Sequence, residues 1–94
     1  MTTLFAKHKV KDFQGWKRVY DNLAQLRNQN GVTSASVHQD PQNSNEVIVT
    51  HQFKNVNAAM TFVNSNELKE AMEKSGVISQ PEMWFGNDVE HTPY

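Results

Sequence analysis

The amino-acid sequence predicts an α+β fold whose six elements follow the order strand, helix, strand, strand, helix, strand. Three observations predict it. Apolar and polar residues alternate in four short segments, apolar residues recur at helical spacing in two longer segments, and turn-forming residues separate the segments. A chain of 94 residues has room for a single domain, which we expect to span residues 1–94.

The expected strands cover residues 2–10, 33–39, 46–54 and 82–86. Two helices are expected between them, and each begins after a residue that commonly caps helices, Asp12 in one and Asn55 in the other. The first helix ends at Asn30-Gly31. The second ends at Gly76, after a break that Ser65 caps again. Turn-forming residues 40–45 (DPQNSN) make the second and third strands a hairpin, and residues 87–94 form a polar tail.

Right-handed crossovers between these elements give a ferredoxin-like βαββαβ arrangement. We expect a four-stranded antiparallel sheet with both helices on one face, and within it we expect the first and third strands to be central and parallel to each other. The other face carries Phe5, Ile48 and Trp84 among polar residues. Because a monomer rarely leaves such an apolar surface in water, we expect a homodimer that pairs two open sheet faces.

Composition excludes several classes of function. Charged residues make up 20% of the chain and the formal net charge is −1, so no electrostatic footprint for nucleic acid is present. The absence of cysteine excludes disulfides and thiolate sites. No run approaches the ~18 apolar residues of a membrane span, and no secretion signal opens the chain. We therefore expect a cytoplasmic protein with neither nucleic acid nor membrane as a partner.

His8 and His51 are the candidate catalytic residues, because each lies on the inward face of an expected central strand. In suitable register the two imidazoles would share one cleft under the first helix and move protons near neutral pH. The alternative is that each ring only packs in the core. We expect no metal site, since neither a carboxylate nor a third histidine falls on that face.

Aromatic and apolar residues would form the walls of this cleft. Trp16 and Tyr20 lie one turn apart on the inward side of the first helix, with Phe62 and Met72 opposite. These residues predict a pocket for a small, flat, mostly apolar or aromatic ligand, in which the Tyr20 hydroxyl supplies a polar group. A purely structural aromatic stripe is the alternative. Arg27, at the end of the same stripe, is expected to form a salt bridge, with contact to an anionic group as the alternative.

Several segments resemble a known family. The first helix reads DFQGWKRVYDNLAQLR, the opening strand ends HKV, and the last third contains SNELKEAMEKSGV and PEMWF. From His8 to Phe85 the chain is similar to small stand-alone proteins of the dimeric α/β-barrel superfamily, whose best-known members are the antibiotic-biosynthesis monooxygenases. The resemblance implies a barrel formed by two sheets across a dimer, with a ligand cleft between helices and sheet in each subunit.

Two departures from the family pattern bear on cofactors. Haem-degrading and monooxygenase members often carry Trp and His where this chain has Val63 and Met72. We therefore expect no haem and no other cofactor. Oxygenation without a cofactor stays open, because it depends on a substrate that activates oxygen itself.

Two functions follow from these residues. One is a cofactor-independent monooxygenase or isomerase that acts on a small aromatic or polyketide-like compound, with His8 or His51 as proton acceptor and Tyr20 as an orienting donor. The alternative is a non-enzymatic dimeric protein that binds a small molecule or serves as an accessory subunit.

Overall fold

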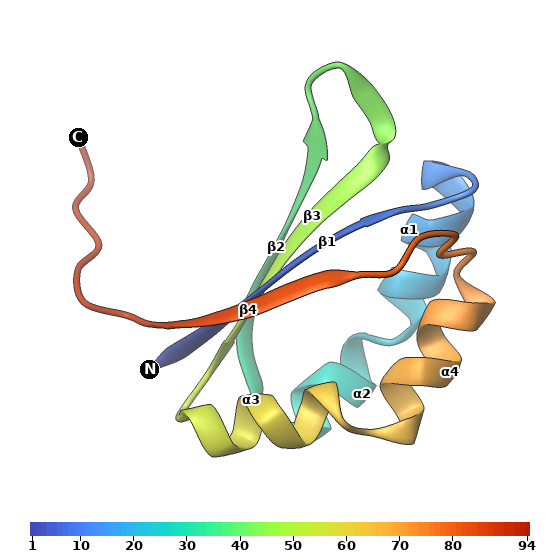
Figure 1. Cartoon of the computed structure of the whole chain (residues 1–94). Coiled ribbons are helices and arrows are strands. Elements are labelled where there is room, and N and C mark those ends of the chain that lie inside the picture. Colours follow the sequence, from blue (N-terminus) through green and yellow to red (C-terminus); the bar gives the residue numbers. More distant parts are fainter.

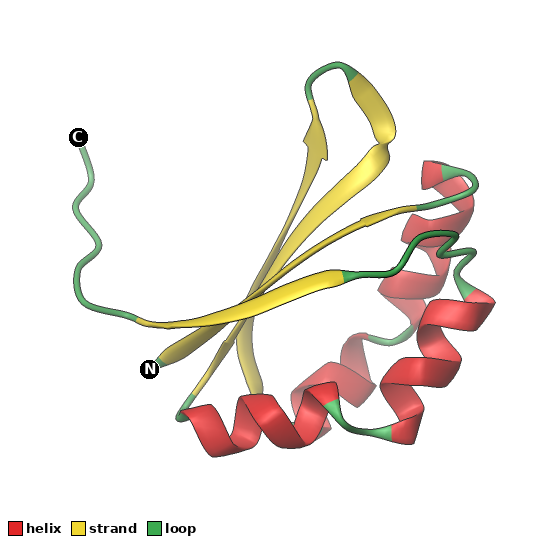
Figure 2. Ribbon diagram, in the orientation of Figure 1, coloured by secondary structure: helices red, strands yellow, loops and turns green.

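A computed structural model describes residues 1–94 and shows a ferredoxin-like α+β fold with four helices on one face of a four-stranded sheet (Figures 1 and 2). The strands are β1 (Thr2–Lys9), β2 (Val32–Asp40), β3 (Asn43–Phe53) and β4 (Glu82–Asn87). The helices are α1 (Phe13–Asn22), α2 (Ala24–Gln29), α3 (Val56–Val63) and α4 (Asn66–Lys74). None of these helices has the length and apolar character that crossing a membrane requires.

The sheet has the order β2-β3-β1-β4, and every neighbouring pair is antiparallel. The prediction that the first and third strands are central is confirmed, but the prediction that they are parallel is wrong. The helical crossover after β1 returns the chain so that β2 runs in the direction of β1. The hairpin then reverses the chain, so β3 runs opposite to β1.

The second expected helix divides as predicted, and the first divides unexpectedly. Ser65 caps α4 by accepting a hydrogen bond from the Leu68 amide at 3.2 Å. Leu23 separates α1 from α2 with φ −102° and ψ 14°, and no side chain caps the break. The hairpin is also tighter than expected: Asp40 pairs directly with Asn43, so the strands continue into the segment predicted as turn.

The predicted inward faces of the central strands are confirmed. Along β1 every second residue is buried, and the inward set of β3 is buried too (Leu4, Ala6, His8, Val47, Val49, His51 and Phe53). The apolar residues of this set pack against the helices in two clusters, one around Phe53 and Phe62 and the other around Val10 and Trp16. The core therefore lies between the sheet and the helical layer, which is where both histidines are held.

The opposite face of the sheet is free of helices (Figure 1). There Phe5 stacks on Trp84 with ring centroids 5.6 Å apart and an angle of 8° between the rings. Trp84 remains 48% exposed. The sequence-based assignment of Trp84 to the face of Phe5 is confirmed by this contact.

Candidate functional site

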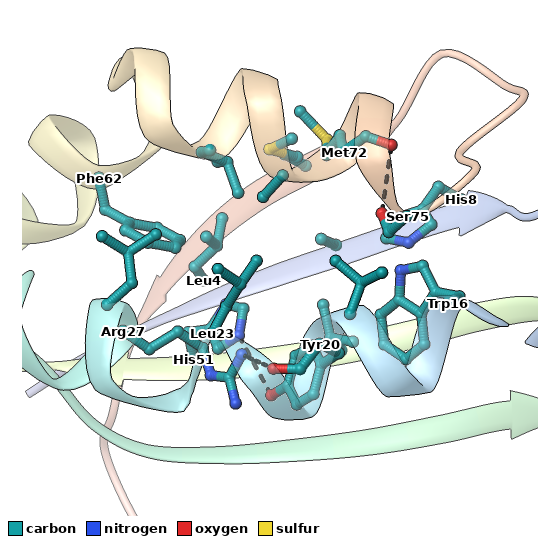
Figure 3. A pocket seen from close by; sticks show the side chains of 17 residues that line it. Leu4, His8, Trp16, Tyr20, Leu23, Arg27, His51, Phe62, Met72 and Ser75 are labelled. Carbon is teal, nitrogen blue, oxygen red and sulfur yellow. Dashed lines mark hydrogen bonds between the residues drawn. The ribbon is translucent and has the colours of Figure 1, made fainter. Parts of the chain in front are cut away.

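A pocket lies between the sheet and the helices, and 13 of its 17 lining residues are hydrophobic. Helices α1 and α2 form one wall, α4 forms the other, and β1 crosses behind (Figure 3). The cavity has a volume of about 80 Å³. This volume is smaller than the ~300–1,000 Å³ of typical ligand sites. A ligand larger than a few atoms therefore requires the walls of the pocket to move apart.

All six residues predicted for the site line this pocket: His8, Trp16, Tyr20, His51, Phe62 and Met72. The shared face of β1 and β3 brings in the two histidines, and helical spacing brings Trp16 and Tyr20 to the same wall. The predicted cleft under the first helix is thus present.

The two histidines lie at opposite ends of the pocket (Figure 3). His51 stands opposite Leu4 in the ladder, and His8 lies four residues further along β1. Four strand residues span about 13 Å, so one small group does not contact both imidazoles. The histidines therefore define two separate polar points.

Aromatic rings connect these two points. The centroid of Trp16 lies 5.8 Å from that of His8 and 4.9 Å from that of Tyr20. Tyr20 and His51 follow at 6.2 Å with nearly parallel rings, and Phe62 meets His51 edge-on at 5.6 Å. This continuous aromatic wall is suited to a flat ligand that stacks along it.

At one end, His51 forms a long hydrogen bond with Tyr20. The Tyr20 hydroxyl lies 3.5 Å from Nε2 of His51, while Nδ1 of His51 is buried without a partner. Burial and the positive charge of Arg27 lower the pKa of His51 to about 4. Burial raises the pKa of Tyr20 above its ordinary value. Near neutral pH both groups are uncharged.

At the other end, His8 packs against Trp16 and is 7% exposed. Both of its ring nitrogens are buried and neither forms a hydrogen bond within the chain. Leaving such a group unpaired costs about 1–3 kcal/mol, so an unpaired buried imidazole needs an explanation. Burial also lowers the pKa of His8.

Arg27 does not form the salt bridge that the sequence suggested. The ion pairs of the chain are Lys7–Glu46 and Lys17–Asp21. Instead, the Arg27 guanidinium lies over the Tyr20 ring, with its central carbon 3.6 Å from the ring centroid. Nη1 of Arg27 donates to the Tyr20 carbonyl oxygen at 2.6 Å. The pocket thus has a cation at the His51 end.

Sequence reasoning missed several lining residues. Ser75 is 8% exposed and lines the His8 end, where its hydroxyl donates to the Met72 carbonyl. Its position beside the helix-ending Gly76 gave no signal other than a cap. Leu23 and Leu26 also line the wall; helical spacing predicts their inward position, but neither was assigned to the site. No group of three or more His, Cys, Asp or Glu side chains is placed to hold a metal ion.

Comparison with known proteins identifies a family. The model of the family described as antibiotic biosynthesis monooxygenase matches residues 7–74. A search among curated proteins found no match.

Solved structures share the fold over nearly the whole chain. A putative antibiotic biosynthesis monooxygenase from Bordetella bronchiseptica superposes with a TM-score of 0.81 at 13% identity, covering 95% of this chain and 97% of that one. SnoaB, a cofactor-independent oxygenase from Streptomyces nogalater, gives 0.79 at 9% identity, covering 99% and 97%. A putative antibiotic biosynthesis monooxygenase from Caulobacter crescentus gives 0.76 at 16% identity, covering 95% and 90%.

Proposed function

The chain belongs to the antibiotic biosynthesis monooxygenase family, and we propose that it is a cytoplasmic, monooxygenase-like protein that oxidises a small aromatic or polyketide-like compound in the pocket without a cofactor. The observation that carries the proposal is the pair of buried imidazoles in one aromatic-walled pocket, of which His8 has no hydrogen-bond partner and His51 keeps one ring nitrogen unpaired. A solved relative in fold, SnoaB, is described as a cofactor-independent oxygenase.

The proposed reaction converts an activated methylene to a carbonyl. The substrate R₂CH₂ and O₂ give R₂C=O and H₂O, so the electrons that reduce oxygen come from the substrate. Removal of one methylene proton produces the carbanion that donates these electrons. The apolar lining keeps water away from this anion.

We assign the proton transfer to His8. Both of its nitrogens are free of protein partners, so one can accept a proton from a substrate that lies against Trp16. His51, whose pKa is lowered to about 4, is a weaker base near neutral pH. We assign to His51 and Tyr20 the orientation of the substrate by hydrogen bonds at the other end.

Anthrone is a suitable test substrate, because it is flat, aromatic and carries an activated methylene. We expect the wild-type protein to accelerate oxygen uptake and the appearance of anthraquinone. His8→Gln should reduce the rate at least a hundredfold, within the ~10²–10⁴-fold range typical of general acid–base catalysis. His91→Gln, the same substitution in the exposed tail, should leave the rate unchanged. Equal rates in wild type and His8→Gln, with both folded by circular dichroism, would refute the role of His8.

A non-enzymatic binding role is the second candidate. The lowered pKa of both histidines favours it, since neutral, weakly basic imidazoles serve well as hydrogen-bonding groups for a bound molecule. Saturable binding of aromatic compounds without any oxygen uptake would support this role over the enzymatic one.

We further propose that the protein acts as a homodimer that pairs the open sheet faces. Proteins of this family are commonly homodimers. The exposed Trp84 and its stacking partner Phe5 lie on the face that no helix covers, where a second sheet would remove them from water.

A further inference from the structure

Arg27 is the only lining residue of the pocket with a formal charge at neutral pH, since both lining histidines are neutral. No carboxylate lies within salt-bridge distance of it. On α1, Lys17 and Asp21 pair with each other at 2.5 Å. The half-buried Arg27 therefore places a positive charge without a carboxylate partner beside a mostly apolar lining.

The position of this charge is fixed by two contacts. The guanidinium stacks on the Tyr20 ring at 3.6 Å, and Nη1 is bonded to the Tyr20 carbonyl oxygen at 2.6 Å. Only part of the donor fork is used, because an arginine has five N–H donors. The remaining donors stand beside the pocket without an acceptor from the chain.

A second polar group points to the same end. His51 is 6% exposed, and its Nδ1 is buried without a partner. Together with the Tyr20 hydroxyl, Arg27 and His51 form a set of hydrogen-bonding groups beside an otherwise apolar wall (Figure 3). A planar carboxylate matches this set, because its oxygens accept bidentate bonds from a guanidinium and further bonds from neutral donors.

We propose that Arg27 is an anion-binding residue and that the pocket takes an elongated aromatic carboxylate, whose acid group binds at Arg27 and whose other end reaches His8. This inference rests on the proposed function, because it adds an anchoring end to the pocket in which His8 reacts. The separation of about 13 Å between His51 and His8 along the sheet makes the ligand long, with its acid remote from the reacting carbon.

Two ligands of almost equal shape test the proposal, 2-naphthoate and its neutral analogue 2-naphthamide. Their affinities for the wild-type protein are measured by isothermal titration calorimetry. We expect the carboxylate to bind about tenfold more tightly or better, as charge-assisted bidentate bonds do relative to neutral ones. In Arg27→Gln this preference should disappear while the affinity for the amide stays within twofold.

Arg18→Gln provides the matched control, since Arg18 is exposed, does not line the pocket and carries the only other guanidinium. It should keep the full preference for the carboxylate. A measurement on the wild-type protein avoids dependence on variant folding. In NMR spectra, 2-naphthoate should shift the side-chain Nε–H signal of Arg27 and leave that of Arg18 in place.

The outcomes separate the two proposals. Equal affinity of both ligands for the wild type, or a preference that survives in Arg27→Gln, overturns the role of Arg27. Neither result contradicts the proposal that the apolar pocket binds a ligand. Failure of both ligands to bind the wild type overturns the ligand pocket itself, and the anion site with it. An unshifted Arg27 signal in the presence of bound 2-naphthoate also overturns the assignment.

Discussion

At the scale of residues, the buried histidines His51 and His8 make the stability of the fold depend on pH. The ordinary pKa of His51 is 6.5, and burial with the nearby charge of Arg27 lowers it to about 4 in the folded chain. Between these values the unfolded chain binds a proton that the folded chain does not bind. Stability is therefore intact above pH 6.5 and decreases as the pH falls towards 4. His8 acts in the same direction, because burial lowers its pKa as well.

The predicted size of this effect is about 3 kcal/mol for His51, from the difference between 6.5 and about 4. Urea unfolding of the wild type, measured at fixed protein concentration from pH 7.5 to pH 4, should show a loss of that order. His51→Gln should remove most of the dependence in this window, while His91→Gln in the exposed tail should retain it. Unchanged pH dependence in His51→Gln would show that His51 is not held neutral by its surroundings.

At the scale of elements, two of the helices that line the pocket, α2 and α4, are held less firmly than α3. Helix α3 buries Ala59 and Phe62, whereas α2 and α4 contain no buried residue. Elements with few buried apolar contacts open at low free-energy cost. A cavity volume of about 80 Å³ is therefore compatible with a larger ligand, because these helices are the walls that can move apart.

Hydrogen exchange measures this difference directly. We expect backbone amides of α2 and α4 to exchange faster than those of α3, and saturation with 2-naphthoate to slow exchange in α2 and α4 most. The strand β2 lies outside the pocket lining and serves as the internal reference. Equal protection of α3 and α4, or ligand-induced protection confined to β2, would contradict the prediction that α2 and α4 open more easily than α3.

The elements also show what the sequence can and cannot predict. The Ser65 cap was predictable because a local side chain carries it, with its hydroxyl donating to the Phe62 carbonyl and accepting from the Leu68 amide. The break at Leu23 was not, because no capping residue marks it. The alternation of apolar and polar residues predicted that His8 and His51 face the helices. The distance between them depends on the register of β1 and β3, which pairs His51 with Leu4. Register is set by contacts between strands, so the sequence pattern of either strand alone did not predict this distance.

At the scale of the whole molecule, the open sheet face governs assembly. Trp84, on the edge strand β4, is 48% exposed and stacks on Phe5 of the central strand β1. Burying half of a tryptophan surface of ~150–250 Å² contributes about 2–3 kcal/mol. In a two-fold symmetric dimer each substitution acts twice, so this one residue has a large influence on association.

We therefore expect the wild type to sediment as a dimer at micromolar concentration and Trp84→Glu to weaken the dimer by more than a hundredfold, because two carboxylates would lose water on pairing. Met60→Glu is the matched control, since Met60 is 47% exposed but lies on α3, on the helical side. It should leave the dimer intact. A stable monomeric wild type, or equal effects of the two substitutions, would mean that the stacked Phe5 and Trp84 remain in water and that the pocket is complete within one chain.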